Sequence, residues 1–207
     1  MQSNPYPLPI GNLFTADSIY RMPLFQRKYV WTEKKNLEEF KSDISKLIDV
    51  YTSDENSKVF LGAVILQEHR GTQSTADSKE FTVIDGQQRM TTIYLTILAL
   101  CKFAKEKGFD DEAESLKDRY LLSAGVSTKN YPKIIPTNFD TEQFKNILND
   151  IDFLGAKLPS VRGDNSGRLK SAYKFIKEKV VEELILLWAE EYSWTEKESF
   201  DHFRDLF

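Results

Sequence analysis

The sequence predicts an α+β protein, in which a small mixed sheet packs against helices and a helical subdomain follows. Two short apolar segments, 59–66 and 80–84, have the length and composition of buried strands. From residue 87 onward, apolar residues recur with the 3.6-residue period of helices. The chain has 207 residues, 41% hydrophobic and 29% charged, which suits one substantial globular domain with part of a second.

The N-terminal segment combines extended stretches with one helix. Its three early prolines predict an extended N-terminal segment, and a short helix or turn is expected over 16–20. The proline within 21–25 favours an edge strand or an extended loop there. Thr32 is placed as the N-cap of the first long helix. The apolar residues that follow the helical period there are Leu37, Phe40, Ile44, Leu47 and Ile48.

The sheet is expected to be mostly antiparallel. Segments 59–66 and 80–84 read as a hairpin, because the polar sequence 71–78 between them predicts a loop. Asp85 and Gly86 end the second strand, and a helix begins directly afterwards. Its apolar face is expected to comprise Met90, Ile93, Tyr94, Ile97, Leu98 and Cys101, and Gly108 stands where a helix C-terminus favours a left-handed residue.

The second half is predicted to be mostly helical. Helices are expected over 111–122, 140–151 and 168–191, with an extended connector at 131–136. The core side of the long helix is predicted to comprise Leu169, Ala172, Tyr173, Ile176, Val180, Leu184, Leu187 and Trp188.

Thr195 and Glu198 form a capping box for a last helix. The apolar stripe of that helix has no stop signal before Phe207, which predicts that the chain is part of a longer protein. We expect residues 1–129 to form the core and residues 130–207 the helical subdomain.

Composition excludes several classes of protein. The net charge of −4 does not suit a dedicated DNA-coating domain, so any nucleic acid would bind through a local patch. The single cysteine, Cys101, excludes an internal disulfide, and its apolar helical context favours a small buried side chain. The N-terminus has no secretory signal, and no apolar run approaches the roughly 20 residues of a membrane span. A cytoplasmic protein is expected.

Catalytic patterns based on histidine are absent from the sequence. His69 and His202 are the only histidines, and neither belongs to a metal-ligand or nucleophile pattern. A nuclease of the HNH kind needs more histidines than this chain contains. We therefore predict neither a protein-built metal site nor DNA cleavage by this chain alone.

The segment 83–92 carries the clearest chemical signal. The first turn of a helix presents unpaired N–H groups and the positive end of the helix dipole, which attract anions. Gly86 allows a tight turn and close approach of a phosphate, and Arg89 can add a bidentate contact. The other residues that can contribute are Asp85, which could position a water or a cation, the neutral donors Gln87 and Gln88, and the hydroxyls of Thr91 and Thr92.

A purely structural interpretation of the same segment stays open. Asp85 can serve as an N-cap, and Arg89 can pair with an acid on a neighbouring helix. The segment is not a Walker A loop, because it lacks both the glycine spacing and the Lys-Ser/Thr pair.

A second cluster, residues 22–31, alternates aromatic side chains with Gln26, Arg27 and Lys28. Such side chains can stack on a base and contact phosphate. They can equally form a strand or loop that is anchored by its aromatic residues, with the cations in solvent.

Three segments together resemble a known family. Segment 23–31, the Phe60–Ile65 run and the Asp85-Gly86-Gln87-Gln88-Arg89 box resemble, in order and spacing, the N-terminal domain of GmrSD-type modification-dependent restriction endonucleases. The family pattern is Ile-Pro-x-Tyr-Gln-Arg-x-Tyr-x-Trp, a Phe-Leu-Gly strand and Asp-Gly-Gln-Gln-Arg. Segments 133–136 and 169–175 also look similar. This chain has Phe25 where the pattern has tyrosine, so a role for that phenolic hydroxyl is not carried over.

The resemblance implies a ParB/sulfiredoxin-like core that receives nucleotide phosphates at a helix start. It implies NTP as ligand, with Mg²⁺, and partners that comprise modified DNA and an HNH-type nuclease domain or subunit. Carried over, Asp85 to Arg89 form the nucleotide box, with Asp85 and Arg89 as catalytic residues. Gln26, Arg27 and Tyr29 line the same pocket.

Two functions follow as expectations. The first is a nucleotide-binding, NTP-hydrolysing sensor domain of a restriction or anti-phage defence system. The alternative is a ParB-like DNA-binding module that uses nucleotide as a conformational switch without hydrolysis. The sequence lacks a clear carboxylate pair for Mg²⁺, which is the feature that argues against easy hydrolysis.

Overall fold

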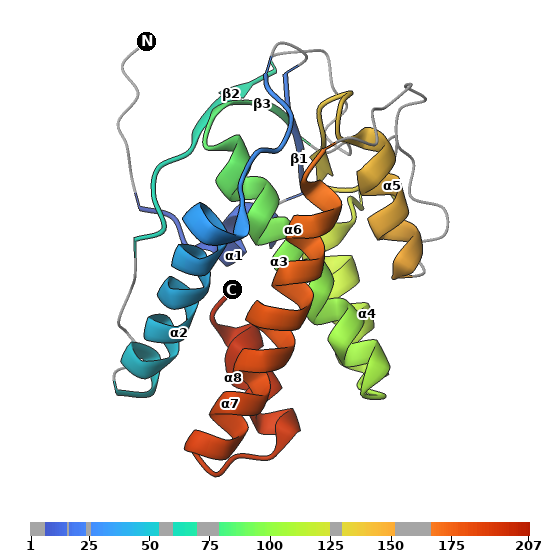
Figure 1. Ribbon diagram of the computed structural model, residues 1–207. Helices are drawn as coiled ribbons and strands as arrows, with labels where there is room; N and C mark the ends of the chain where they lie inside the picture. The colour runs from blue at the N-terminus through green and yellow to red at the C-terminus, as the bar shows by residue number, and fades with distance from the viewer. Residues whose placement is uncertain are drawn as a thin grey trace.

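The protein is described here from a computed structural model. The residues that the structure describes are 7–15, 17–23, 26–53, 60–69, 79–124, 130–151 and 167–207. They form an α+β fold, as the sequence predicts, in which one small sheet lies at one end and helices extend away from it (Figure 1). The ParB-like character of the core and the domain boundary near residue 130 stay predictions.

The sheet is mixed and has four strands in the order β2-β3-β1-β4. Its strands are β1 Ser18–Arg21, β2 Ile65–Glu68, β3 Lys79–Asp85 and β4 Ile134–Ile135. The hairpin of β2 and β3 is antiparallel, as predicted, whereas β1 runs parallel to both β3 and β4. The expectation of a mostly antiparallel sheet is therefore wrong, because two of the three strand pairs are parallel.

Two strands lie where the sequence predicted other structure. The segment 16–20 was expected to form a short helix or turn, but α1 spans Ile10–Thr15 and β1 follows it. Ile19 and Tyr20 are almost completely buried there, and β1 pairs on both sides with strands from distant parts of the chain. The connector 131–136 contains β4 for the same reason. Long-range pairing of this kind leaves little trace in local sequence.

The strand predicted over 59–66 is shorter than expected. It begins only at Ile65, and Gly62 has φ +105°, outside the extended region of a strand, while residue 59 lies outside the described residues. Phe60, which was expected in a buried strand, is 84% exposed. Residues 22 and 23 are likewise outside any strand, while Phe25 and the predicted loop 71–78 lie outside the described residues.

Helix α3, Gln87–Glu106, is the centre of the fold. Its residues from 90 to 101 are all buried, because helices and sheet surround it. The buried hydroxyl of Tyr94 donates to the carbonyl of Leu121 at 2.7 Å. Cys101 is buried as predicted, and burial raises the pKa of its thiol to about 11. Gly108, with φ +76°, follows the helix end.

The first long helix begins with the π-helical turn η1 Glu33–Leu37 and continues as α2 Glu38–Ser53. Thr32 is the N-cap, as predicted, but its side chain makes no capping bond. The carboxamide of Asn36 instead accepts the Thr32 N–H at 3.3 Å. Leu47 is only partly buried.

The remaining helices surround α3. They are α4 Asp110–Leu116, the π-helical η2 Lys117–Leu121, α5 Thr141–Asp150 and α8 Glu196–Asp205. The predicted capping box at the start of α8 is present, since the Thr195 side chain accepts from the Glu198 N–H and Glu198 accepts from the Thr195 N–H.

One long helix runs through α6 Leu169–Phe175, the π-helical η3 Ile176–Glu182 and α7 Glu183–Glu191. The sequence predicted Leu187 on its core side, but Leu187 is 48% exposed and Ile185 is buried instead. The π-helical turns of η3 contain more than 3.6 residues each. They shift the core stripe relative to the uninterrupted α-helix on which the prediction was based.

Candidate functional site

Gly86 lies at the junction of β3 and α3, where the sequence places it. It is the N-cap of α3 and has φ +86°, in the left-handed region. The segment 60–64 crosses close to this turn. A β-carbon at Gly86 would lie 3.0 Å from the Ala63 carbonyl oxygen and 3.0 Å from Val64 Cγ2. Both the backbone angle and the close crossing therefore favour glycine here.

Replacing Gly86 with alanine is expected to destabilise the fold by roughly 1–3 kcal/mol, from left-handed strain plus crowding against residues 63 and 64. The matched control is Gly108→Ala, because Gly108 also has positive φ but a β-carbon there would meet nothing within 4 Å. Denaturant unfolding of both variants measures the difference. Equal losses of stability would show that the crossing segment does not constrain the turn.

The two glutamines of the box hold the segment 26–30, which we call the strap. The Gln88 carboxamide oxygen accepts the Val30 N–H at 2.9 Å, and its NH₂ group donates to the Lys28 carbonyl at 3.4 Å. The Gln87 NH₂ group donates to the Arg27 carbonyl at 3.4 Å. The second predicted cluster is thus attached to the first turn of α3 through hydrogen bonds between the glutamine side chains and the strap backbone.

Tyr29 fixes the middle of the strap from both sides. Its hydroxyl lies 2.7 Å from the Thr92 hydroxyl, which itself donates to the Gln88 carbonyl, so the Tyr29 O–H donates. Burial raises the pKa of Tyr29 well above its usual value. The Tyr29 backbone N–H donates to Asp140 Oδ2 at 2.8 Å, and the Thr137 hydroxyl donates to the same oxygen at 3.1 Å.

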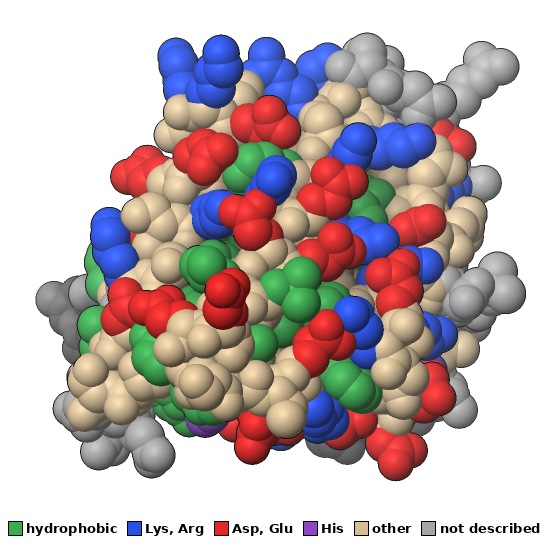
Figure 2. Space-filling view, turned by 60° about the horizontal axis from the view of Figure 1, so that its bottom comes forward, with side chains coloured by type: hydrophobic (Ala, Val, Ile, Leu, Met, Phe, Trp, Pro, Cys, Tyr) green, Lys and Arg blue, Asp and Glu red, His purple; other side chains and the backbone are tan. Residues whose placement is uncertain are grey.

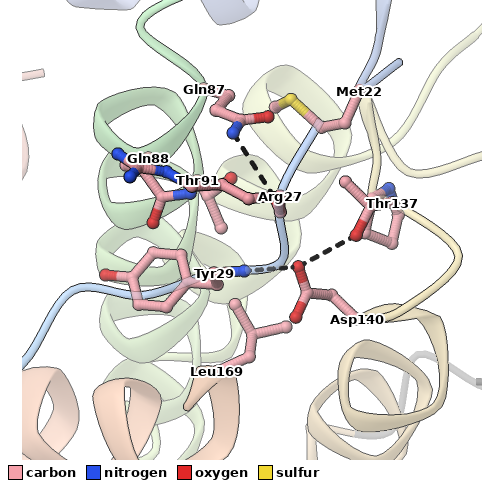
Figure 3. Close-up of a pocket in the computed structure, with 10 residues that line it drawn as sticks. Met22, Arg27, Tyr29, Gln87, Gln88, Thr91, Thr137, Asp140 and Leu169 are labelled. Carbon is pink, nitrogen blue, oxygen red and sulfur yellow. Dashed lines mark hydrogen bonds between the residues drawn. The ribbon is translucent and has the colours of Figure 1, made fainter. Parts of the chain in front are cut away.

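A pocket of about 10 Å³ lies between the strap, α3 and the start of α5 (Figure 3). Five predicted site residues line it, namely Arg27, Tyr29, Gln87, Gln88 and Thr91. The other lining residues are Met22, Pro136, Thr137, Asp140 and Leu169. The structure therefore brings the two separate sequence clusters to one pocket.

Asp140 is the site residue that sequence reasoning missed. It is 5% exposed, and burial raises the pKa of its carboxyl. In the sequence it reads only as a residue at the start of a helix, where aspartate is common. Its position three residues after Thr137, directly behind the segment 133–136, was the one available signal.

Three other predicted site residues are placed differently. Arg89 is directed toward the segment 60–64, where its guanidinium donates to the Ala63 carbonyl at 2.9 Å. A β-carbon at Gly62 would overlap that guanidinium. Gln26 donates to the Ile84 carbonyl at 3.1 Å. Neither Arg89 nor Gln26 is among the described residues that line the pocket, and Asp85 is exposed at the end of β3.

The arrangement offers two chemically different regions. Around Gly86, the first turn of α3 and the Arg89 guanidinium provide donors that suit an anion. In the pocket, by contrast, carboxylate and carboxamide oxygens provide acceptors. No group of three His, Cys, Asp or Glu residues that could hold a metal ion occurs within the described ranges.

The end of the molecule away from the sheet has no large region of a single charge sign. Figure 2 shows Lys and Arg side chains interspersed with Asp and Glu over most of that face. Lys197, for example, lies 2.7 Å from Glu112 and 2.8 Å from Asp201, and Arg204 lies 2.8 Å from Asp201. The mixture of signs on this face differs from a basic stripe for nucleic acid.

A comparison with protein families identifies a match over nearly the whole chain. The model of the GmrSD restriction endonuclease N-terminal domain matches residues 10–206, which is nearly the whole chain. No curated protein matches the sequence. Of the helices in the described part of the chain, none combines the length and apolar character needed to cross a membrane.

Proposed function

The chain belongs to the family of GmrSD restriction endonuclease N-terminal domains, and from this premise we propose that it is the nucleotide-binding, NTP-hydrolysing sensor domain of a modification-dependent restriction system. Such a system acts in defence against phage with modified DNA. Cleavage of that DNA would be performed by an HNH-type nuclease domain or partner subunit.

One observation carries the proposal. The Gly86 turn joins a strand to the N-terminus of a 20-residue helix, and the strap is attached to the first turn of that helix. The unpaired N–H groups and the helix dipole favour a phosphate there. Arg27 on the strap is exposed, so its cation is available beside that turn.

In the proposed mechanism the backbone amides of Gly86, Gln87 and Gln88 hold the phosphates. The Arg89 guanidinium uses one of its donors on the Ala63 carbonyl, and its remaining donors stabilise negative charge that grows in the transition state. Asp85, which is exposed beside the turn, would orient the attacking water or hold a Mg²⁺ ion. Mg²⁺ commonly binds through one or two carboxylates together with substrate phosphates.

A specific observation supports the second candidate, a nucleotide-switched module that does not hydrolyse. The backbone of the strap is held by Gln87 and Gln88 in α3 and by Asp140 at the N-cap of α5. A ligand that competes for these few side chains would release the strap, and such a change can serve as a switch.

Phosphate release from each NTP, with and without Mg²⁺, tests the proposal. The pure protein is expected to release phosphate in a Mg²⁺-dependent way, and Asp85→Asn is expected to lower kcat by about a hundredfold or more with little change in melting temperature. Glu68→Gln, an exposed carboxylate on β2, is the matched control. Nucleotide binding without any release of phosphate would favour the switch over the hydrolase.

A further inference from the structure

The side chain of Arg89 lies directly over Gly62, on the segment that crosses the Gly86 turn. A β-carbon at Gly62 would overlap the central carbon of the guanidinium, and it would lie 2.6 Å from both Nε and Nη2. Because the central carbon is the closest of these three atoms, the plane of the guanidinium lies flat against Gly62 rather than edge-on. Gly62 also has φ +105°, which residues other than glycine rarely adopt. Both the backbone angle and the guanidinium therefore favour glycine at this position.

A single carbonyl group connects the guanidinium to the Gly86 turn. The Ala63 carbonyl oxygen accepts from Nη1 of Arg89 at 2.9 Å, and the same oxygen lies 3.0 Å from the position that a β-carbon of Gly86 would take. The edge formed by Nε and Nη2 stays open, since it donates to no residue in the described part of the chain. That edge is the planar fork with which arginine binds two oxygens of a phosphate.

Packing of the core does not explain the contact between Gly62 and Arg89. None of the residues from 60 to 64 is buried, and Phe60 is 84% exposed. Glycine loses more conformational freedom on folding than any other residue, so an unburied glycine adds nothing to stability by itself. A side chain at position 62 would, however, push the guanidinium away from the turn. The contact thus serves the orientation of Arg89 more than the stability of the fold.

We propose that Gly62 is a positioning residue for Arg89, and that the segment 60–64 is the second wall of the phosphate site, beside the Gly86 turn. This inference rests on the proposed function. Gly62 provides the flat surface under the guanidinium, and the Ala63 carbonyl prevents its rotation. The open edge of Arg89 then binds two phosphate oxygens. A fork that is aligned in advance loses less conformational freedom on binding than a mobile one.

Gly62→Ala tests the inference in two backgrounds, the wild type and Arg89→Ala. Calorimetric titration with each of the four ribonucleoside triphosphates, in the presence of Mg²⁺, measures affinity. In the wild type the new methyl group is expected to displace the guanidinium and to weaken binding about 10- to 100-fold. In Arg89→Ala, where the guanidinium is absent, the same substitution should change affinity by less than about twofold.

Gly108→Ala is the matched control for the backbone angle. Gly108 has φ +76°, but a β-carbon there would meet nothing within 4 Å. Its replacement should therefore lower the melting temperature without changing nucleotide affinity. The control separates the effect of left-handed strain from the effect of displacing Arg89.

Arg89→Lys tests the same point without a change at Gly62, and it decides alone should Gly62→Ala fail to fold. Lysine keeps the charge but has neither the flat face nor the fork, so its affinity should lie within about fivefold of that of Arg89→Ala. Affinity of Arg89→Lys within about twofold of the wild type would overturn the inference. So would unchanged affinity of a folded Gly62→Ala, or an equal loss in both backgrounds. These three results leave the proposed function intact, whereas absence of binding of every triphosphate to the wild type would refute both.

Discussion

Arg89→Ala is expected to weaken nucleotide binding or the transition state by roughly 30- to 1,000-fold, or about 2–4 kcal/mol, because a charge-assisted and bidentate contact to an anion is lost. Stability should fall far less, by about 1 kcal/mol. The one described hydrogen bond of the guanidinium is its donation to the Ala63 carbonyl.

Nucleotide affinity and melting temperature measured on the same sample decide the role of Arg89. Arg119→Ala is the control for loss of a cation, since Arg119 is exposed and lies on η2. A purely structural Arg89, which would serve only to hold the segment 60–64, gives the opposite result. Unchanged affinity together with a large fall in melting temperature would exclude the phosphate role.

Lys133→Met is expected to give the largest loss of stability, about 3 kcal/mol or more, because it leaves two buried carbonyl groups without a donor. Lys133 is 3% exposed, and its ammonium group donates to the Phe14 carbonyl at 2.6 Å and to the Arg119 carbonyl at 2.7 Å. It thereby connects α1, η2 and the segment that leads into β4. Denaturant unfolding measures the loss, and Lys170→Met, at an exposed position, is the control. A loss below about 1 kcal/mol would show that water replaces the ammonium group.

The stability that Lys133 confers should also depend on pH. Burial lowers the pKa of its ammonium group in the folded protein to about 8, from an ordinary value of 10.5. Between these two values the unfolded chain binds more protons than the folded one, so stability rises with pH across this window. The advantage of the wild type over Lys133→Met should therefore be about 2 kcal/mol greater at pH 9.5 than at pH 7. An equal difference at both values would contradict the lowered pKa.

Features that local rules determine could be predicted from the sequence. The strand that ends at Asp85, the turn at Gly86 and the capping box of Thr195 and Glu198 are all indicated by residues adjacent in the sequence. The burial of Cys101 followed from its place on a helical stripe. The convergence of the strap with α3 was expected from the family resemblance.

Features that depend on distant partners could not be predicted. Strand β1 is stabilised by parallel pairing with β3 and β4, which lie about 60 and 115 residues further along the chain. The direction of Arg89 is set by the crossing segment at Gly62, and the burial of Asp140 by the strap. None of these partners is marked by a local pattern, and for that reason the pocket acid was missed.

Because η3 lies within the last long helix, the buried face of α7 depends on the number of residues in η3. Each residue of an α-helix advances the side chain by about 100°, so the buried positions of Ile185 and Trp188 depend on how many residues η3 contains. Removing one residue from η3 while its winding is kept would turn α7 by nearly a third of a revolution, so that Leu186 would take the buried position of Ile185 and Trp188 the exposed position of Leu187. The number of residues in η3 therefore determines which face of α7 is buried, whatever side chains α7 carries.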